Sequence, residues 1–228
     1  MHFSLISPRP GHENQAAHQM LQGPYREHQW LWQLFPAEEG TPRDFIFRRT
    51  EVGGLPRYHV VSKRPPLREG QAWGVQTKLY QPQLQTGDTL EFELCANPVV
   101  TRTVNGKHSR HDVVMDAKRQ HLVQLGLATW AEMPEADRPA AYELVAGACT
   151  RWLTEQGKRC GFAFRADQIS VDSYLQHVIK NGKLKFSTVE FVGTLVVTDA
   201  EKFVAMLQSG LGHAKAFGCG LMLVRRPV

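Results

Sequence analysis

The pattern of hydrophobic and polar positions along this chain predicts a mixture of strands and helices. Apolar runs broken by Gly or Pro predict strands at residues 2–6, 45–49, 57–62, 75–79 and 89–95. A helix is predicted from Gly23-Pro24 to Phe35, because proline is tolerated at the first helical position and Pro36 ends the run. We assign these elements to a first domain, residues 1–97.

The pattern in residues 98–228 predicts a second domain with its own sheet. A hairpin around Asn105-Gly106 is expected to join 99–103 to 113–114, and helices are expected at 117–125 and 140–156, the latter ended by Gly157. Asn181-Gly182 lies between the β-rich runs 174–179 and 186–192, which is the strongest short hairpin signal. Thr198 and Glu201 fit a capping box for a helix that stops at Gly210, and 221–224 reads as a closing strand.

The order of these elements indicates the fold class. Strand, helix, two hairpin strands, helix and strand is the ferredoxin-like order, and the first half of the chain can be interpreted as a more degenerate copy of it. We therefore predict an α+β protein of two tandem ferredoxin-like (RRM-like) domains, each with a mostly antiparallel sheet and helices on one face. No internal sequence repeat supports the duplication independently.

A glycine-rich segment near the C-terminus is the first candidate for binding chemistry. Its glycines surround one lysine: Gly210, Gly212, Lys215, Gly218 and Gly220. Glycine adopts positive φ without steric cost, and successive N–H groups in such a loop can form an anion-binding concavity that a lysine completes. The segment fits neither a Walker loop nor a dinucleotide-binding turn. The alternative is a loop that only connects a helix to a strand.

Charge and composition favour a polyanionic partner. The chain has 228 residues, 42% of them hydrophobic, and a net charge of +5. No apolar run approaches the roughly 20 residues that span a bilayer, so we expect a cytoplasmic protein with no membrane partner. Dispersed cysteines and the absence of H-E-x-x-H lead us to expect no metal and no cofactor. Basic residues cluster in three places: Arg102, Lys107 and Arg110; Lys180, Lys183 and Lys185; and Lys215, Arg225 and Arg226.

The predicted helix at 24–35 carries the candidate catalytic groups. Tyr25 and His28 are three residues apart, so a phenol and an imidazole face the same side of the helix. Unpaired N–H groups in the first turns disfavour an imidazolium, by about 0.3–1 kcal/mol at exposed sites, which biases His28 toward its neutral form. In the structural alternative, Tyr25, Trp32 and Phe35 form a core stripe and His28 is a neighbour with satisfied hydrogen bonds.

Four motifs together resemble the CasE family, the CRISPR repeat-processing endoribonucleases of type I-E systems. The most specific is Tyr-x-x-His-Gln-x-Leu-Trp-x-Leu-Phe-Pro at 25–36, and the others are Arg-Asp-Phe-Ile-Phe at 43–47, Phe-Glu-Leu-Cys-Ala-Asn-Pro at 92–98, and Gly-Leu-Gly-x-Ala-Lys-Ala-Phe-Gly-Cys-Gly-Leu at 210–221. They span both ends of the chain in the family's order. Residues 7–22 and 126–140 look longer than the family pattern.

The resemblance implies a metal-independent enzyme that binds the stem-loop of CRISPR repeat RNA and cuts at the 3′ base of the stem. The 2′-hydroxyl attacks the adjacent phosphorus, giving a 2′,3′-cyclic phosphate and a 5′-hydroxyl, and the crRNA stays bound beside the other Cascade subunits. By the same match His28 is the general base or the general acid, and Tyr25 assists it. Some members have a lysine five residues after the histidine, where this chain has Gln33. The alternative is a non-catalytic RNA-binding subunit of the same superfamily.

The RNA-binding residues expected are basic or belong to the glycine-rich segment. A basic hairpin can hold the phosphates of an A-form stem even though its deep major groove cannot easily be read. Lys183 and Lys185 are the strongest candidates on that hairpin. The full predicted set is Arg102, Lys180, Lys183, Lys185, Gly210, Gly212, Lys215, Gly218 and Gly220.

Overall fold

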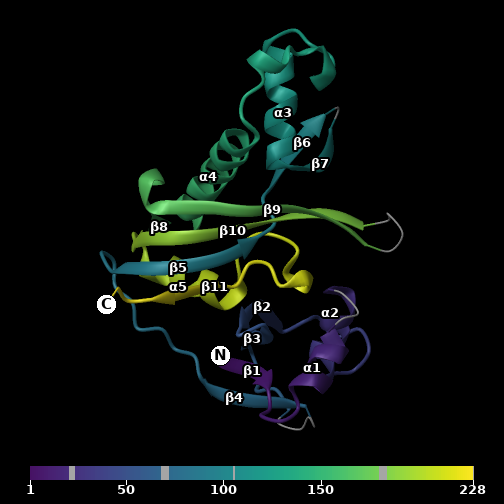
Figure 1. The fold of residues 1–228 in the computed structure, drawn as a ribbon. Coiled ribbons are helices and arrows are strands. Elements are labelled where there is room, and N and C mark those ends of the chain that lie inside the picture. Colours follow the sequence, from purple (N-terminus) through teal and green to yellow (C-terminus); the bar gives the residue numbers. More distant parts are fainter. Residues whose placement is uncertain (21–23, 68–71, 105, 180–183, 228) are drawn as a thin grey trace. The chain divides into compact units, whose positions relative to one another are not determined.

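A computed structural model describes residues 1–20, 24–67, 72–104, 106–179 and 184–227 (Figure 1). The chain forms two compact units. The first contains Met1–Leu84 and Val204–Met222, and the second contains Gln85–Phe203 and Leu223–Val228. In the described part of the chain, no helix has the length and apolar character needed to cross a membrane.

The first unit contains a four-stranded antiparallel sheet. Its strands are β1 (His2–Pro8), β2 (Phe45–Val52), β3 (Leu55–Ser62) and β4 (Trp73–Leu79), in the order β2-β3-β1-β4. Helices α1 (Glu13–Met20) and α2 (Pro24–Gln33) lie between β1 and β2 in the sequence. The strand order is the ferredoxin order, but the described residues between β3 and β4 include no second helix. The first unit is therefore the degenerate copy that the sequence predicted.

Aromatic side chains build the core of this unit and hold α2 against the sheet. Phe35 stacks on Phe45 with ring centroids 4.5 Å apart, and Trp30 lies 4.5 Å from Trp73. The buried cluster comprises Ile6, Ala16, Leu31, Leu34, Phe35, Phe45, Phe47, Tyr58, Val60, Ala72 and Trp73. Because α2 and the turn that follows it contribute Leu31, Leu34 and Phe35, the orientation of this helix is determined by packing rather than by helix propensity.

A guanidinium satisfies the carbonyl groups at the end of α2. Arg64 donates to the carbonyl oxygens of Phe35, at 2.8 Å, and Pro36, while its Nε donates to Asp44 Oδ2 at 2.7 Å. Both carbonyls belong to the turn that follows Gln33, the last residue of α2, so Arg64 fixes the chain as it leaves the helix. The contact also ties the chain just before β2 to the end of α2.

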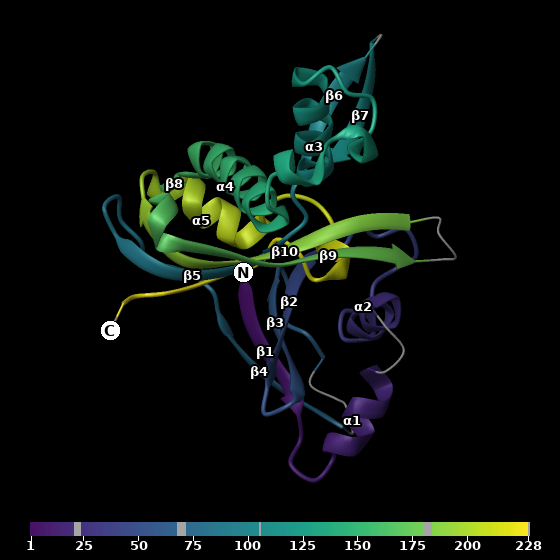
Figure 2. The ribbon, with the colours of Figure 1, turned by 45° about the horizontal axis from the view of Figure 1, so that its top comes forward.

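The second unit contains the complete ferredoxin order. Its strands are β5 (Thr89–Ala96), β8 (Phe162–Ala163), β9 (Ile169–Ile179), β10 (Leu184–Val197) and β11 (Met222–Arg225). The sheet order is β11-β5-β10-β8, with β9 also pairing β10. Helix α4 (Ala141–Cys160) covers one face, where Trp152 stacks on Phe191 (Figure 2). The start of α5 (Ala200–Ser209), up to Phe203, belongs to the same unit, and Phe203 packs edge-on against Phe162.

The boundary expected after residue 97 differs from the arrangement of the structure. The prediction that residues 89–95 belong to the first domain is wrong, because β5 pairs with β10 from Thr89 to Ala96. The alternation of buried Leu90, Phe92 and Leu94 indicates a half-buried strand but carries no information about its partner. The first segment of the first unit ends at Leu84 instead. The same unit also contains Val204–Met222, from much later in the sequence.

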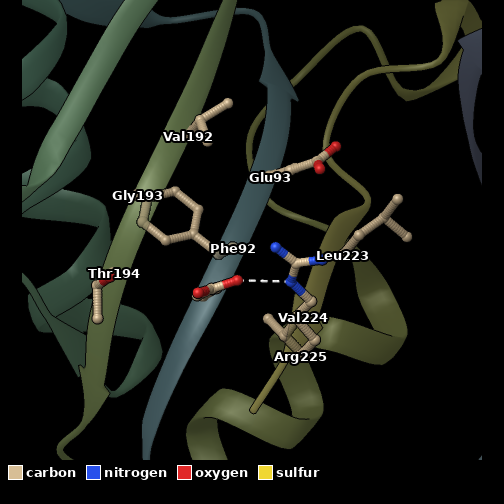
Figure 3. A pocket seen from close by; sticks show the side chains of 9 residues that line it. Phe92, Glu93, Val192, Gly193, Thr194, Leu223, Val224 and Arg225 are labelled. Carbon is tan, nitrogen blue, oxygen red and sulfur yellow. Dashed lines mark hydrogen bonds and ion pairs between the residues drawn. The ribbon is translucent and has the colours of Figure 1, made fainter. Parts of the chain in front are cut away.

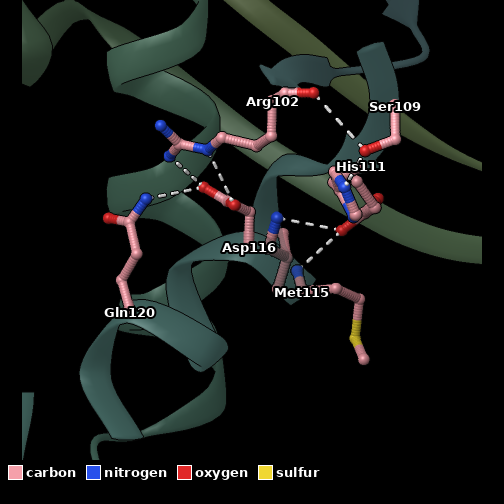
Figure 4. A network of polar contacts seen from close by, with 8 residues as sticks. Arg102, Ser109, His111, Met115, Asp116 and Gln120 are labelled. Atoms are coloured by element: carbon pink, nitrogen blue, oxygen red, sulfur yellow. Dashed lines mark hydrogen bonds and ion pairs between the residues drawn. The ribbon is translucent and has the colours of Figure 1, made fainter. Parts of the chain in front are cut away.

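The hairpin expected after β5 is present, but its second strand differs from the predicted one. Strand β6 (Val99–Val104) pairs with β7 (Lys107–Asp112), so Val113 and Val114 begin α3 (Val113–Gln124) instead of forming a strand. The reason is an N-cap: Asp112 Oδ1 accepts from the backbone N–H groups of Val114 and Met115, both at 2.9 Å (Figure 4). Two short 3₁₀ helices follow, η1 (Trp130–Glu132) and η2 (Glu135–Asp137).

Helix α4 continues beyond the expected stop at Gly157. It ends at Cys160, and Gly161 adopts the left-handed conformation that terminates helices. Gly157 is inside the helix, and only glycine fits there because a Cβ would lie 2.5 Å from the carbonyl oxygen of Phe162. A third short helix, η3 (Ala166–Gln168), then leads into β9.

Candidate functional site

His28 lies in the second turn of α2 and is half-buried. The indole Nε1–H of Trp32 donates to His28 Nε2 at 3.1 Å, with the two rings edge-to-face. His28 Nδ1 is buried and has no hydrogen-bond partner among the described residues. Because an accepting Nε2 must be unprotonated, this geometry assigns the neutral tautomer with its proton on Nδ1.

The pKa of His28 is lowered from its usual value, first by burial and second by the positive charge of Arg43. Both effects disfavour the imidazolium, and the hydrogen bond from Trp32 can form only with the neutral ring. Sequence analysis expected a neutral His28 from the helix N-terminus. The structure gives the same protonation state, but its causes are burial and a neighbouring guanidinium.

Arg43 precedes β2 and is the charged neighbour of His28. Its Nη1 is buried with no hydrogen-bond partner among the described residues, and its Cζ lies 5.9 Å from the centroid of the Phe45 ring. Burial lowers the pKa of its guanidinium from the ordinary value, although arginine stays charged near neutrality. A buried cationic donor that lacks an acceptor is a candidate ligand for an anion.

Tyr25 falls in α2 as predicted, but its side chain lies outside the described part of the structure. Its proximity to His28 therefore stays a prediction.

The glycine-rich segment belongs to the same unit as α2 and packs against α2 and β2. Its middle forms the short helix η4 (Lys215–Phe217), where the Phe217 ring lies 6.5 Å from the His28 ring. The predicted positive φ values are confirmed at Gly210, Gly212, Gly218 and Gly220. Residues from the two ends of the sequence thus form one site.

Close packing explains why three of these positions are glycine. An added Cβ would lie 3.0 Å from Ile46 at Gly210, 3.2 Å from Phe47 at Gly218, and 2.5 Å from the carbonyl oxygen of Leu211 at Gly220. Lys215 Nζ donates to the carbonyl oxygen of Ser209 at 2.9 Å, which stabilises the end of α5. These contacts support the structural interpretation of the loop, and phosphate binding by Lys215 stays a prediction.

A buried acid next to His28 is a feature that sequence analysis missed. Glu27 is 6% exposed; its Oε1 lies 3.2 Å from Arg49 Nη1, and it is hydrogen-bonded to Tyr58. Burial raises the pKa of Glu27, with Arg49 and Tyr58 opposing the shift. Its spacing from Leu31 and Leu34 places it on the buried face of α2, which is the signal that could have revealed it.

The three basic clusters of the sequence are partly neutralised. Arg102 makes a two-pronged ion pair with Asp116, with Nε donating to Oδ1 at 3.0 Å (Figure 4). Arg225 Nε pairs with Glu91 at 2.5 Å, and Arg226 pairs more weakly with Asp88. Lys185 is exposed on β10, whereas Lys180 and Lys183 lie outside the described residues.

A pocket of about 380 Å³ in the second unit contains none of the predicted site residues. It is formed by β5, β10 and β11, and Glu91, Glu93, Val192 and Arg225 are among its lining residues (Figure 3). Two carboxylates against one guanidinium make it unfavourable for a phosphate. Among the described residues, no group of three or more His, Cys, Asp or Glu side chains could hold a metal ion.

Comparison with known proteins gives consistent matches over the whole chain. A family model described as "CRISPR associated protein" matches residues 1–226. The chain is 31% identical over 202 residues to the Escherichia coli K12 protein named CRISPR system Cascade subunit CasE, covering 87% of this chain and 89% of that protein. It is 28% identical over 225 residues to the CRISPR-associated endoribonuclease Cse3 of Thermus thermophilus, covering 92% and 94%.

Solved structures share the fold. The structure of Thermus thermophilus Cse3 bound to an RNA representing a pre-cleavage complex has a TM-score of 0.66 at 24% identity, covering 99% of this chain and 100% of that one. Cas6e from Escherichia coli K-12 has a TM-score of 0.62 at 23% identity, with 100% of both chains covered. The prediction of two ferredoxin-like domains is confirmed by these neighbours and by the two sheets.

Proposed function

This chain belongs to the CasE family of type I-E CRISPR-associated proteins, and on that basis we propose that it is an endoribonuclease that processes CRISPR RNA as a subunit of Cascade. The observation that carries the proposal is the family match over residues 1–226, which includes the helix that bears His28. A relative named as a Cascade subunit and another named as an endoribonuclease support the two parts of the proposal.

The reaction proposed is metal-independent cleavage at the 3′ base of the repeat stem. The 2′-oxygen forms a bond to the adjacent phosphorus and loses its proton, and the bond from phosphorus to the 5′-oxygen breaks. The leaving oxygen takes up a proton, so the products are a 2′,3′-cyclic phosphate and a 5′-hydroxyl. Incubation of the purified protein with its repeat RNA in EDTA, followed by identification of both ends, tests this directly.

We assign His28 the role of general base toward the 2′-hydroxyl. Its lowered pKa keeps the imidazole neutral at pH 7, which is the form that accepts a proton. In the RNA-free protein the lone pair of Nε2 is occupied by the Trp32 indole, so the 2′-hydroxyl must replace Trp32 as the donor. Such rearrangements are common, because catalytic hydrogen bonds often align only when substrate is bound. Tyr25, one turn earlier, would help to orient the reacting groups.

This role predicts the pH dependence of cleavage. A general base is inactive when protonated, so kcat/KM should fall as the pH drops through the pKa of His28 and should be constant above it. Because burial and Arg43 lower that pKa, the fall should occur below pH 6.5, the ordinary value for histidine. Rates measured between pH 4.5 and 9 check the prediction. A rate that declines as the pH rises through that same range would assign His28 to the leaving 5′-oxygen instead.

One observation favours the non-catalytic alternative. In the RNA-free protein, Nε2 of His28 accepts a hydrogen bond from Trp32, and Nδ1 is buried. An RNA-binding subunit in which His28 is only structural would have this geometry permanently. It predicts tight binding of repeat RNA without cleavage under any conditions, so the same incubation distinguishes the two functions.

We propose that the long β9–β10 hairpin holds the RNA stem. The two strands pair from Leu184 and Ile179 onward (Figure 1), and Lys185 is exposed where β10 begins. Lys180 and Lys183 lie between the two strands in the sequence, outside the described residues, and we propose that they take part as well. Phosphate contacts of this kind supply affinity without reading sequence. Arg102 is a weaker candidate, because its ion pair with Asp116 must be exchanged before it can bind a phosphate.

Changing both Lys183 and Lys185 to alanine should reduce the salt dependence of RNA binding. Removing one phosphate-binding cation should lower the slope of log Kd against log salt concentration by about one unit. The slope is measured with repeat RNA between 50 and 300 mM salt. Changing Lys158 and Lys202 to alanine is the matched control, because each of these lysines is already paired with a carboxylate. An unchanged slope in the Lys183/Lys185 variant would remove the hairpin from the binding site.

A further inference from the structure

We infer that Arg43 binds the scissile phosphate of the RNA beside His28. The inference rests on the proposed function and extends it, because it assigns the charge that neutralises the reacting phosphate. Three observations carry it: a fixed position next to α2, a buried donor without an acceptor among the described residues, and a direct chain of contacts from Arg43 to His28.

The position of Arg43 is set by its neighbour Asp44. The Asp44 carboxylate accepts from Arg64, which also donates to the carbonyl oxygens at the end of α2. The backbone carbonyl of Asp44 accepts from the N–H of Lys63 at 3.0 Å. Arg43 is therefore attached to a segment that both β3 and α2 hold in place, which is the rigidity a positioning group requires.

A short series of contacts joins the guanidinium to the imidazole. Arg43 lies over the Phe45 ring, and that ring contacts Trp32 edge-on with centroids 5.4 Å apart. Trp32 in turn donates to His28 Nε2. The contacts therefore run from Arg43 through Phe45 and Trp32 to His28, and we expect an RNA oxygen that replaces the indole at Nε2 to come within reach of Arg43.

The buried Nη1 of Arg43 has a hydrogen-bond donor with no acceptor among the described residues. Three other arginines of the first unit have acceptors: Arg9 at the carbonyl oxygen of Trp73, Arg49 at Glu27 and Glu51, and Arg64 at Asp44. Buried polar groups are nearly always paired, so an unpaired cationic donor points to a ligand. A phosphate fits, because guanidinium binds its oxygens with strong charge-assisted hydrogen bonds.

The charges around His28 leave Arg43 as the group suited to this role. Along α2 the described side chains, from Glu27 to Gln33, include no lysine or arginine. Glu27 on the same helix is directed to Arg49 and Tyr58, and Lys215 of η4 donates to Ser209. The positive charge of Arg43 is the second cause, after burial, of the lowered pKa of His28. A phosphate bound there would touch the cation and face the base.

The test measures binding, so it does not depend on cleavage. The probe is repeat RNA with a 2′-deoxy sugar at the cut site, compared with the same RNA carrying an uncharged methylphosphonate at the scissile position. Wild-type protein should bind the methylphosphonate RNA about tenfold more weakly, the equivalent of one charge-assisted hydrogen bond. Arg43→Gln should bind the two RNAs with equal affinity. Arg43→Lys should keep most of the wild-type preference for the RNA with the charged phosphate. Equal discrimination by wild type and Arg43→Gln would overturn the inference.

Cleavage supplies a second readout. Arg43→Gln should lower the single-turnover rate by about 10²-fold, as is typical when one donor to a developing charge is removed. It should also move the acidic limb of the pH profile to higher pH, because the positive charge that lowers the pKa of His28 is gone. Arg165→Gln is the control, since Arg165 is exposed and paired with Asp167 in the second unit. A wild-type protein that never cleaves would refute the proposed function while leaving the methylphosphonate comparison decisive for Arg43.

Discussion

Replacing His28 with alanine is expected to abolish cleavage of repeat RNA and to leave its binding nearly unchanged. General acid–base catalysis by a positioned side chain is worth about 10²–10⁴-fold, so the residual rate should be lower by that factor. The folding cost should be small, because the ring is half-buried and its hydrogen bond within the described structure is to Trp32. Single-turnover cleavage and RNA affinity, both measured in EDTA, separate the two effects.

His12→Ala is the matched control for this experiment. His12 belongs to the same unit but is exposed, and its ring contacts only Gln15 among the hydrogen bonds of its side chain in the described structure. It should cleave at the wild-type rate. An active His28→Ala protein would show that the imidazole does not transfer the proton, and loss of wild-type cleavage in EDTA would show that a metal takes part.

Replacing Gly220 with alanine is expected to destabilise the protein by about 2–4 kcal/mol. Gly220 has a φ of +92°, and a Cβ there would lie 2.5 Å from the carbonyl oxygen of Leu211. The same pair is joined by a hydrogen bond from the N–H of Leu211 to the carbonyl oxygen of Gly220 at 2.8 Å. Backbone strain and a backbone clash therefore add. Urea unfolding followed by fluorescence measures the loss.

Gly87→Ala separates the two contributions. Gly87 has a φ of +97°, but no atom lies within 4 Å of the point that its Cβ would occupy, so alanine there should cost only about 1 kcal/mol from backbone strain. Equal losses at the two positions would mean that the glycine-rich segment is not closely packed. Because that segment places Phe217 beside His28, Gly220→Ala should also slow cleavage, whereas Gly87→Ala should not.

Much of the fold could be predicted from local patterns. Pro24 and Pro36 bracket α2, Asn181-Gly182 separates the two longest strands, and Gly210 ends α5. Each of these signals acts within a few residues, through a fixed φ, a missing N–H or a preferred turn. The order of the elements then sufficed for the ferredoxin-like interpretation. Helical spacing placed Tyr25 and His28 on one side of the helix, and the family motif at 25–36 singled out His28 as the candidate.

Two predictions failed, one because the partner strand is distant in the sequence and the other because a local helix cap was overlooked. The alternation in β5 specifies a buried face but not a neighbour, so its pairing with β10 was assigned to the wrong domain. The N-cap at Asp112 was missed because the apolar pair Val113-Val114 resembles a strand. Phosphate binding by Lys215 stays a prediction, and in the RNA-free structure its ammonium donates to Ser209 within its own unit.

The sequence by itself determined which segments form strands and helices, which helix carries the imidazole, and which family motifs are present. Only the tertiary structure brought Arg43 and Phe217 to His28, whose contact with Trp32 follows from helical spacing, and set the protonation preference of that ring. The physical reason is that backbone preferences act between neighbouring residues, whereas burial and electrostatic fields depend on every element that packs nearby. The chemistry of His28 is therefore a property of its surroundings, and those surroundings come from both ends of the chain.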